Sequence, residues 1–117
     1  MASGTRNVLV VEDQVLIGLE MQDTLTALGY RVVGPFANVA AGLNAAATQD
    51  IDFALLDFDL GHGEDSTPIA KALTSRGLPF AFVTGTESSV VRASFGKSIV
   101  LAKPVDERLL DRLLSAA

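Results

Sequence analysis

The chain has 117 residues, a formal net charge of −5, no cysteine, and 49% hydrophobic against 20% charged residues. This length suffices for one buried core, while the missing cysteines exclude disulfides and thiol catalysis. The negative net charge argues against direct nucleic-acid binding, and the apolar runs are too short for membrane insertion. The segment Met1 to Asn7 lacks the apolar stretch of a signal peptide. A cytoplasmic protein is therefore expected.

Five short apolar runs recur along the chain and are interpreted as buried strands. They cover residues 8–11, 31–33, 53–56, 80–83 and 99–102. Each run is nearly continuous and does not alternate between apolar and polar residues. This pattern is typical of a parallel sheet that is covered by helices on both faces.

Helical patterns lie between these runs. In the first, apolar side chains from Ile17 to Leu28 recur on one face, and Gly29 is suited to the left-handed conformation that ends a helix. The second is an Ala-rich stretch over residues 38–48. Both patterns predict helices that pack on the sheet.

Three further helices are expected after the third run. Thr67 is the predicted N-cap of the first of them, Pro68 suits its first position, and Gly77 follows its end. A short pattern over residues 88–94 has a narrow apolar stripe and predicts a weak helix. The last helix begins after Asp106 as its cap and has leucines in two rows on one face.

The alternation of strands and helices indicates the fold class α/β. The specific expectation is a (βα)5 doubly wound, flavodoxin-like sheet of five parallel strands in the order 2-1-3-4-5, with helices on both faces. Residues 7–117 are expected to form one domain, preceded by a flexible N-terminus over residues 1–6.

Polar side chains follow four of the predicted strands at the point where each strand ends. These residues are Glu12, Asp13, Asp57, Thr84 and Lys103. In an open doubly wound sheet, ligands bind outside the carboxyl ends of the strands, where the strand order reverses. Strands one and three meet at that point, so Asp13 and Asp57 are expected to be neighbours.

Several carboxylates in one crevice repel each other, so a cation is expected among them. Oxygen ligands in a half-open crevice suit Mg²⁺, which retains several waters and completes its shell with a phosphate oxygen. Asp57 is then the candidate nucleophile, since a carboxylate that attacks phosphorus forms an aspartyl phosphate. Lys103 would neutralise charge on the transferred group, and Thr84 would donate a hydrogen bond to it.

Together these residues resemble the receiver domain of bacterial two-component response regulators. The match covers nearly the whole chain and rests on an acidic pair, an acceptor aspartate, a threonine and a lysine-proline pair, which are Glu12-Asp13, Asp57, Thr84 and Lys103-Pro104. Taken singly, each of these polar residues is as well explained as a solvated loop residue, a cap or a strand-end lysine. Because all of them match the family's positions together, they favour a phosphoacceptor site.

The resemblance implies a bound Mg²⁺ or Mn²⁺. Asp13 and Asp57 would be direct ligands together with the backbone carbonyl of Asp59, and Glu12 would act through water. The side chain of Asp59 is equally compatible with a place beside the phosphoryl group and with a solvent-facing loop.

The resemblance also implies how the phosphoryl group is held. Lys103 would pair with it, Thr84 and Gly85 would belong to the switch region, and the Lys103-Pro104 peptide bond is expected to be cis.

The segment Pro79 to Gly85 is similar to stand-alone receivers of alphaproteobacteria that contain a Phe-Ala-Thr-Gly-Tyr sequence. Thr86 stands where that subgroup has tyrosine, and Val100 stands where the family has an aromatic residue in its fifth strand. The usual threonine-aromatic switch is therefore absent. We expect output to depend on backbone ordering over residues 85–98.

The resemblance implies a signalling module that is not a turnover enzyme, apart from slow hydrolysis of its own aspartyl phosphate. A sensor histidine kinase or a histidine phosphotransfer protein would phosphorylate Asp57. Because the sequence ends with the fifth helix, output is expected through protein contact or phosphorelay, and homodimerisation is left open.

Two other functions are considered. Asp57-Phe58-Asp59-Leu60 matches the Asp-x-Asp start of haloacid-dehalogenase-type phosphatases, but it follows the third strand and leaves the Glu12-Asp13 pair unexplained. A phosphorylation-independent interaction domain would not need the acceptor site. His62 lies between two glycines and is interpreted as an exposed loop histidine.

Overall fold

The computed structural model describes residues 6–85 and 98–116. Its elements in chain order are β1 (Asn7–Val11), α1 (Val15–Ala27), β2 (Arg31–Phe36), α2 (Val39–Thr48), β3 (Phe53–Asp57), β4 (Asp59–Gly61), β5 (Glu64–Asp65), α3 (Thr67–Ser75), β6 (Phe80–Thr84), β7 (Ile99–Ala102) and α5 (Glu107–Ala116). Among the residues described, no helix is long and apolar enough to cross a membrane.

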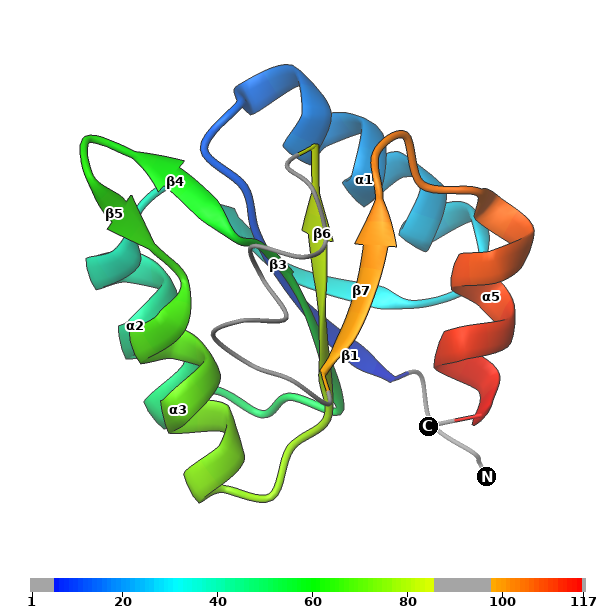
Figure 1. Ribbon diagram of the computed structural model, residues 1–117. Coiled ribbons are helices and arrows are strands. Elements are labelled where there is room, and N and C mark those ends of the chain that lie inside the picture. Colours follow the sequence, from blue (N-terminus) through cyan, green and yellow to red (C-terminus); the bar gives the residue numbers. More distant parts are fainter. Residues whose placement is uncertain (1–5, 86–97, 117) are drawn as a thin grey trace.

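The central sheet has the predicted topology. Its strands lie in the order β2-β1-β3-β6-β7, and every pair is parallel. Numbered by βα unit, this is the order 2-1-3-4-5, so the flavodoxin-like doubly wound sheet is confirmed. Figure 1 shows α2 and α3 on one face of the sheet and α1 and α5 on the other.

The sheet separates two hydrophobic cores. The first lies under α2 and α3 and contains buried Ile69, Leu73 and Phe82. The second lies under α1 and α5 and contains Leu25, Leu110 and Leu114. Since both faces are buried, the central strands are apolar except at their ends, which explains the continuous runs in the sequence.

Three of the described helix ends have clear local causes, and two of them, at Gly29 and Asp106, were predicted from the sequence. Gly29 follows α1 with φ +95°, which glycine adopts without strain. The side chain of Asn38 accepts a hydrogen bond from the backbone N–H of Ala41 at 2.9 Å and so caps α2. Asp106 Oδ1 accepts the backbone N–H of Arg108 at 2.8 Å at the start of α5.

Some expectations need correction. The N-cap of α3 is Ser66 and not Thr67, because Asp65 Oδ1 accepts the Thr67 N–H at 2.8 Å and the helix begins one residue earlier. The second strand extends to Phe36, beyond the apolar run. The segment after β3 forms a separate antiparallel hairpin, β4–β5, which the sequence did not indicate.

Some predictions fall outside the described residues. These are the weak helix over residues 88–94, Thr86, and most of the segment 85–98. Of the expected flexible N-terminus, the structure describes Arg6, whose guanidinium donates a hydrogen bond to the carbonyl of Leu114 at 2.7 Å.

Candidate functional site

The candidate site lies where the carboxyl ends of four parallel strands meet. Glu12 and Asp13 directly follow β1, and Asp57 is the last residue of β3. β3 pairs with β1 on one side and with β6, which ends at Thr84, on the other. β6 pairs with β7 so that Thr84 lies opposite Ala102, and Lys103 follows next. Strand pairing thus brings together residues that are far apart in the sequence.

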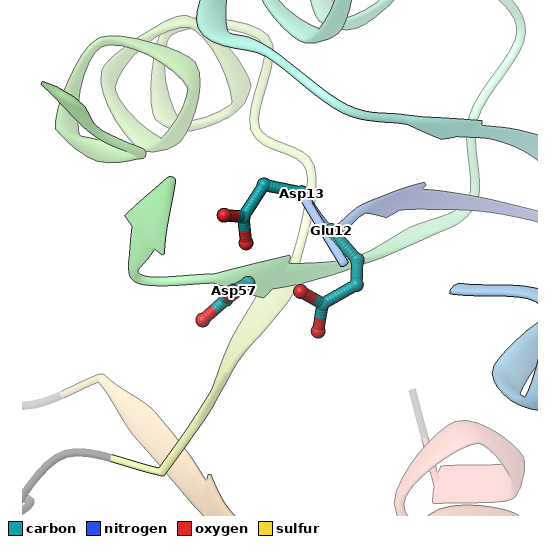
Figure 2. Close-up of side chains that lie close together, drawn as sticks. All are labelled: Glu12, Asp13 and Asp57. Carbon is teal, nitrogen blue, oxygen red and sulfur yellow. The ribbon is translucent and has the colours of Figure 1, made fainter. Parts of the chain in front are cut away.

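Three carboxylates gather at this edge. Glu12, Asp13 and Asp57 each place one oxygen within 4.8 Å of the others (Figure 2). Glu12 and Asp57 are buried, with 3% and 7% of their surface exposed, and Asp13 is half-buried. Since a buried charge is costly without compensation, this cluster needs positive charge close by.

Lys103 supplies part of that charge. Its Nζ lies 2.6 Å from Glu12 Oε1 and 3.4 Å from Asp57 Oδ2. Burial lowers the pKa of Lys103, but the hydrogen bond with Glu12 and the attraction to Asp57 outweigh it, so the net pKa is raised and the amine is charged. The other oxygen of Glu12 accepts the Gln14 N–H at 3.1 Å. Of its two carboxylate contacts, Lys103 lies closer to Glu12 than to Asp57.

The surroundings of the Asp57 carboxyl group favour its neutral form. Burial is the largest cause, and the hydrogen bond and negative charge of Glu12 add to it, so that the pKa of Asp57 is raised to about 8 although Lys103 opposes the shift. One lysine therefore does not compensate the cluster. Three convergent carboxylates with a remaining negative charge fit a divalent cation, which prefers oxygen ligands.

The raised pKa predicts that stability falls with pH. Between the unfolded value of 3.8 and about 8, folded Asp57 keeps a proton that the unfolded chain has released, so rising pH favours unfolding. Asp57→Asn removes this cost and should raise the free energy of unfolding by on the order of 2 kcal/mol at pH 8, and by less at pH 5. Urea unfolding at both pH values in EDTA measures this. An equal difference at both values would contradict the expectation.

A cavity of about 260 Å³ opens over the carboxylates. Its walls are Asp13, Gln14, Ile17, Asp57, Asp59, Gly61, Thr84, Gly85 and Lys103. The structure thus brings six of the predicted site residues around one space. Glu12 does not line this cavity, but its carboxylate lies in the cluster with Asp13 and Asp57 and contacts Lys103.

Pro104 lies outside this cavity, although the Lys103-Pro104 bond is cis as expected. It lines a larger space of about 410 Å³ between α1 and α5, which has mostly apolar walls. Ile17 and Lys103 line both spaces, so the two are adjacent. The carboxylates of Asp13 and Asp57 line the smaller of the two spaces.

Three wall residues were missed by sequence reasoning, namely Gln14, Ile17 and Gly61. For Gln14 and Ile17, the only feature of the sequence that could have indicated a place in the site is that they closely follow Glu12 and Asp13. Gly61 had a clearer signal, because two glycines around His62 mark a tight turn. That turn folds back toward the site, which local sequence does not reveal.

His62 and Asp59 belong to the β4–β5 hairpin, and of the two only Asp59 lines the cavity. His62 is exposed at the hairpin tip with φ +54°, as interpreted from the sequence. Asp59 is also exposed, and its Oδ1 accepts the Gly61 N–H at 2.9 Å. The Asp59 carboxylate is thus turned onto its own hairpin.

Residues 8–115 match the family described as the response regulator receiver domain. No curated protein sequence matches the chain.

Several solved structures are similar over almost the whole chain. SdrG from Sphingomonas melonis is 37% identical with a TM-score of 0.82, and the match covers 99% of this chain and 98% of SdrG. The signal receiver domain of a modulated diguanylate cyclase from Desulfovibrio desulfuricans is 31% identical with a TM-score of 0.84, covering 97% and 94%. A CheY-like receiver domain protein from Methanospirillum hungatei is 28% identical with a TM-score of 0.80, covering 97% and 94%.

Proposed function

Since this chain belongs to the response regulator receiver family, we propose that it is a phosphoacceptor switch in which Asp57 receives a phosphoryl group from a histidine of a partner protein. Receiver domains are signalling modules that interact with histidine kinases or phosphotransfer proteins. The observation that supports this function best is the position of Asp57, between two further carboxylates and Lys103, on the floor of a small open cavity.

The proposed reaction is a phosphoryl transfer. An ionised Asp57 oxygen attacks the phosphorus, and a new oxygen–phosphorus bond forms while the nitrogen–phosphorus bond of the donor phosphohistidine breaks. The leaving imidazole takes the electron pair of that bond. Because the pKa of Asp57 is raised to about 8 by its surroundings, the carboxyl group first has to lose its proton.

Receiver domains bind Mg²⁺ at an acidic pocket, and the donor set here fits such an ion. Asp13 and Asp57 are proposed as direct ligands with the backbone carbonyl of Asp59, and Glu12 as a ligand through water. A bound divalent cation would favour ionised Asp57 and neutralise charge on the phosphoryl oxygens.

Lys103 and Thr84 are proposed to hold the transferred group. The Lys103 amine already lies 3.4 Å from Asp57 Oδ2, so a phosphoryl group on that carboxylate would lie within its reach. Thr84 ends the neighbouring strand and lines the same cavity together with Gly85. Its hydroxyl would donate a hydrogen bond to a phosphoryl oxygen.

The donor protein has to contact the start of α1. The cavity wall includes Gln14 and Ile17, so a histidine that reaches Asp57 brings its protein over this helix. Val15 and Leu16 are 68% and 75% exposed there, although both are apolar. Exposed aliphatic side chains beside a reaction site favour protein contact.

Several finer features belong to the same proposal. Output would pass by protein contact or phosphorelay in the cytoplasm, with no direct binding of nucleic acid. Asp57 would release its phosphoryl group by slow hydrolysis. The family match does not favour the phosphatase interpretation, and Asp59 is exposed and bound to its own hairpin.

Direct binding of Mg²⁺ tests the ligand set. Asp13→Asn removes one proposed ligand charge and should weaken Mg²⁺ binding at least about tenfold, which corresponds to ~1.4 kcal/mol. Asp23→Asn is a matched control, since Asp23 is exposed in α1 and does not line the cavity. Titration followed by amide chemical shifts measures both constants. Equal weakening by both substitutions would indicate a general charge effect and contradict the assigned ligands.

A further inference from the structure

The β4–β5 hairpin forms one wall of the small cavity and is held firmly in place. Asp59 and Gly61 line the cavity, while Leu60 between them is buried in the core under α2 and α3. At the base of the hairpin the Ser66 N–H donates to the carbonyl of Phe58 at 2.9 Å. Core packing and this hydrogen bond fix where the hairpin backbone runs.

Gly61 lies against the candidate metal ligand Asp13. A Cβ atom at position 61 would lie 3.4 Å from Asp13 Oδ2, and among the described residues, apart from the chain neighbours of Gly61, no other heavy atom would lie within 4 Å of it. Gly61 has φ +79°, and its N–H donates to Asp59 Oδ1. The backbone of the hairpin therefore passes close to one oxygen of Asp13 and leaves space where a side chain would begin.

Gly63, the second glycine at the tip of the hairpin, differs from Gly61 in its surroundings. Gly63 has a similar φ of +76°, but a Cβ there would meet no described residue within 4 Å other than its chain neighbours. A side chain at either position has to adopt the left-handed conformation. Only a side chain at position 61 would also contact Asp13.

We propose that Gly61 is a positioning residue that keeps Asp13 Oδ2 open to the water shell of the bound cation. This rests on the proposed function, because it assumes a cation at the carboxylate cluster. Mg²⁺ is bound through few carboxylates and retains several waters in near-octahedral geometry. A methyl group in van der Waals contact with Oδ2 would occupy the space of such a water.

The test compares Gly61→Ala with Gly63→Ala in the full chain. Mg²⁺ affinity is measured by calorimetric titration, and the melting temperature is measured in EDTA. Both substitutions should lower the melting temperature similarly, since both introduce a left-handed alanine and preserve the backbone N–H. Gly61→Ala should weaken Mg²⁺ binding about three- to tenfold, whereas Gly63→Ala should bind as the wild type does.

Each outcome distinguishes this inference from the proposed function. Wild-type affinity in Gly61→Ala would overturn the role of Gly61 and leave the phosphoacceptor function intact. Equal weakening in both variants would also overturn it, because strain in the hairpin would then be the cause. Absence of Mg²⁺ binding by the wild type would overturn both.

Discussion

Incubation with acetyl phosphate and Mg²⁺ is expected to add one phosphoryl group to the wild-type chain and none to Asp57→Asn. An amide oxygen is a poor nucleophile toward phosphorus, and the substitution preserves the size of the side chain. Asp57 is the carboxylate on the cavity floor next to Lys103. Intact mass measured after a short incubation gives the stoichiometry directly.

Two controls sharpen this experiment. Asp59→Asn preserves the backbone carbonyl proposed as a ligand, and the wild-type carboxylate is engaged with Gly61, so this variant should still accept the phosphoryl group. EDTA should prevent the adduct on the wild type, because the pKa of about 8 keeps Asp57 largely protonated at neutral pH when no cation is bound. An adduct on Asp57→Asn would exclude Asp57 as the acceptor.

A negative result would also be informative. If the wild type gains no phosphoryl group and also fails to bind beryllofluoride, the phosphoacceptor function is wrong for this chain. A phosphorylation-independent interaction domain would then be the better interpretation. Turnover of a generic phosphomonoester that is lost in Asp59→Asn would instead support the phosphatase interpretation.

Lys103→Met is expected to destabilise the fold and to slow phosphorylation. Lys103 is the charge that compensates buried Glu12, whose Oε1 has no other hydrogen-bond partner among the described residues. Removing one partner of a buried ion pair is strongly destabilising, and the 17% exposure of the lysine side chain reduces the loss to about 2 kcal/mol at neutral pH. Urea unfolding measures the loss of stability, and the initial rate with acetyl phosphate measures the loss of activity.

A double variant separates the two effects. Adding Glu12→Gln to Lys103→Met removes the uncompensated charge and should recover part of the stability, but not the phosphorylation rate. Lys71→Met is the control for the loss of an exposed lysine and should change stability little. If Lys103→Met were as stable as Lys71→Met, the ion pair with Glu12 would contribute nothing to the fold.

Prediction from sequence succeeded where the signal was local or periodic. The apolar runs and helical faces indicated the strands of the sheet and the described helices, and the predicted cap Asp106 accepts the Arg108 N–H at the start of α5. The same approach misplaced the N-cap of α3, because Asp65 in the unpredicted hairpin supplies the hydrogen bond to Thr67. Capping depends on which neighbour is close enough to accept, and the hairpin decides that.

The sequence by itself determined the order of the five strands of the central sheet and of the four described helices, and which residues stand at the ends of those strands. Hydrophobic runs and helical faces are enough for those features, and the strand order 2-1-3-4-5 is expected from the known order of doubly wound sheets. Only the tertiary structure decided that Lys103 contacts Glu12 more closely than Asp57, that the pKa of Asp57 rises, and that Gly61 lies against Asp13. These depend on distances and burial among residues from different elements, which the packing of the sheet and its hairpin sets.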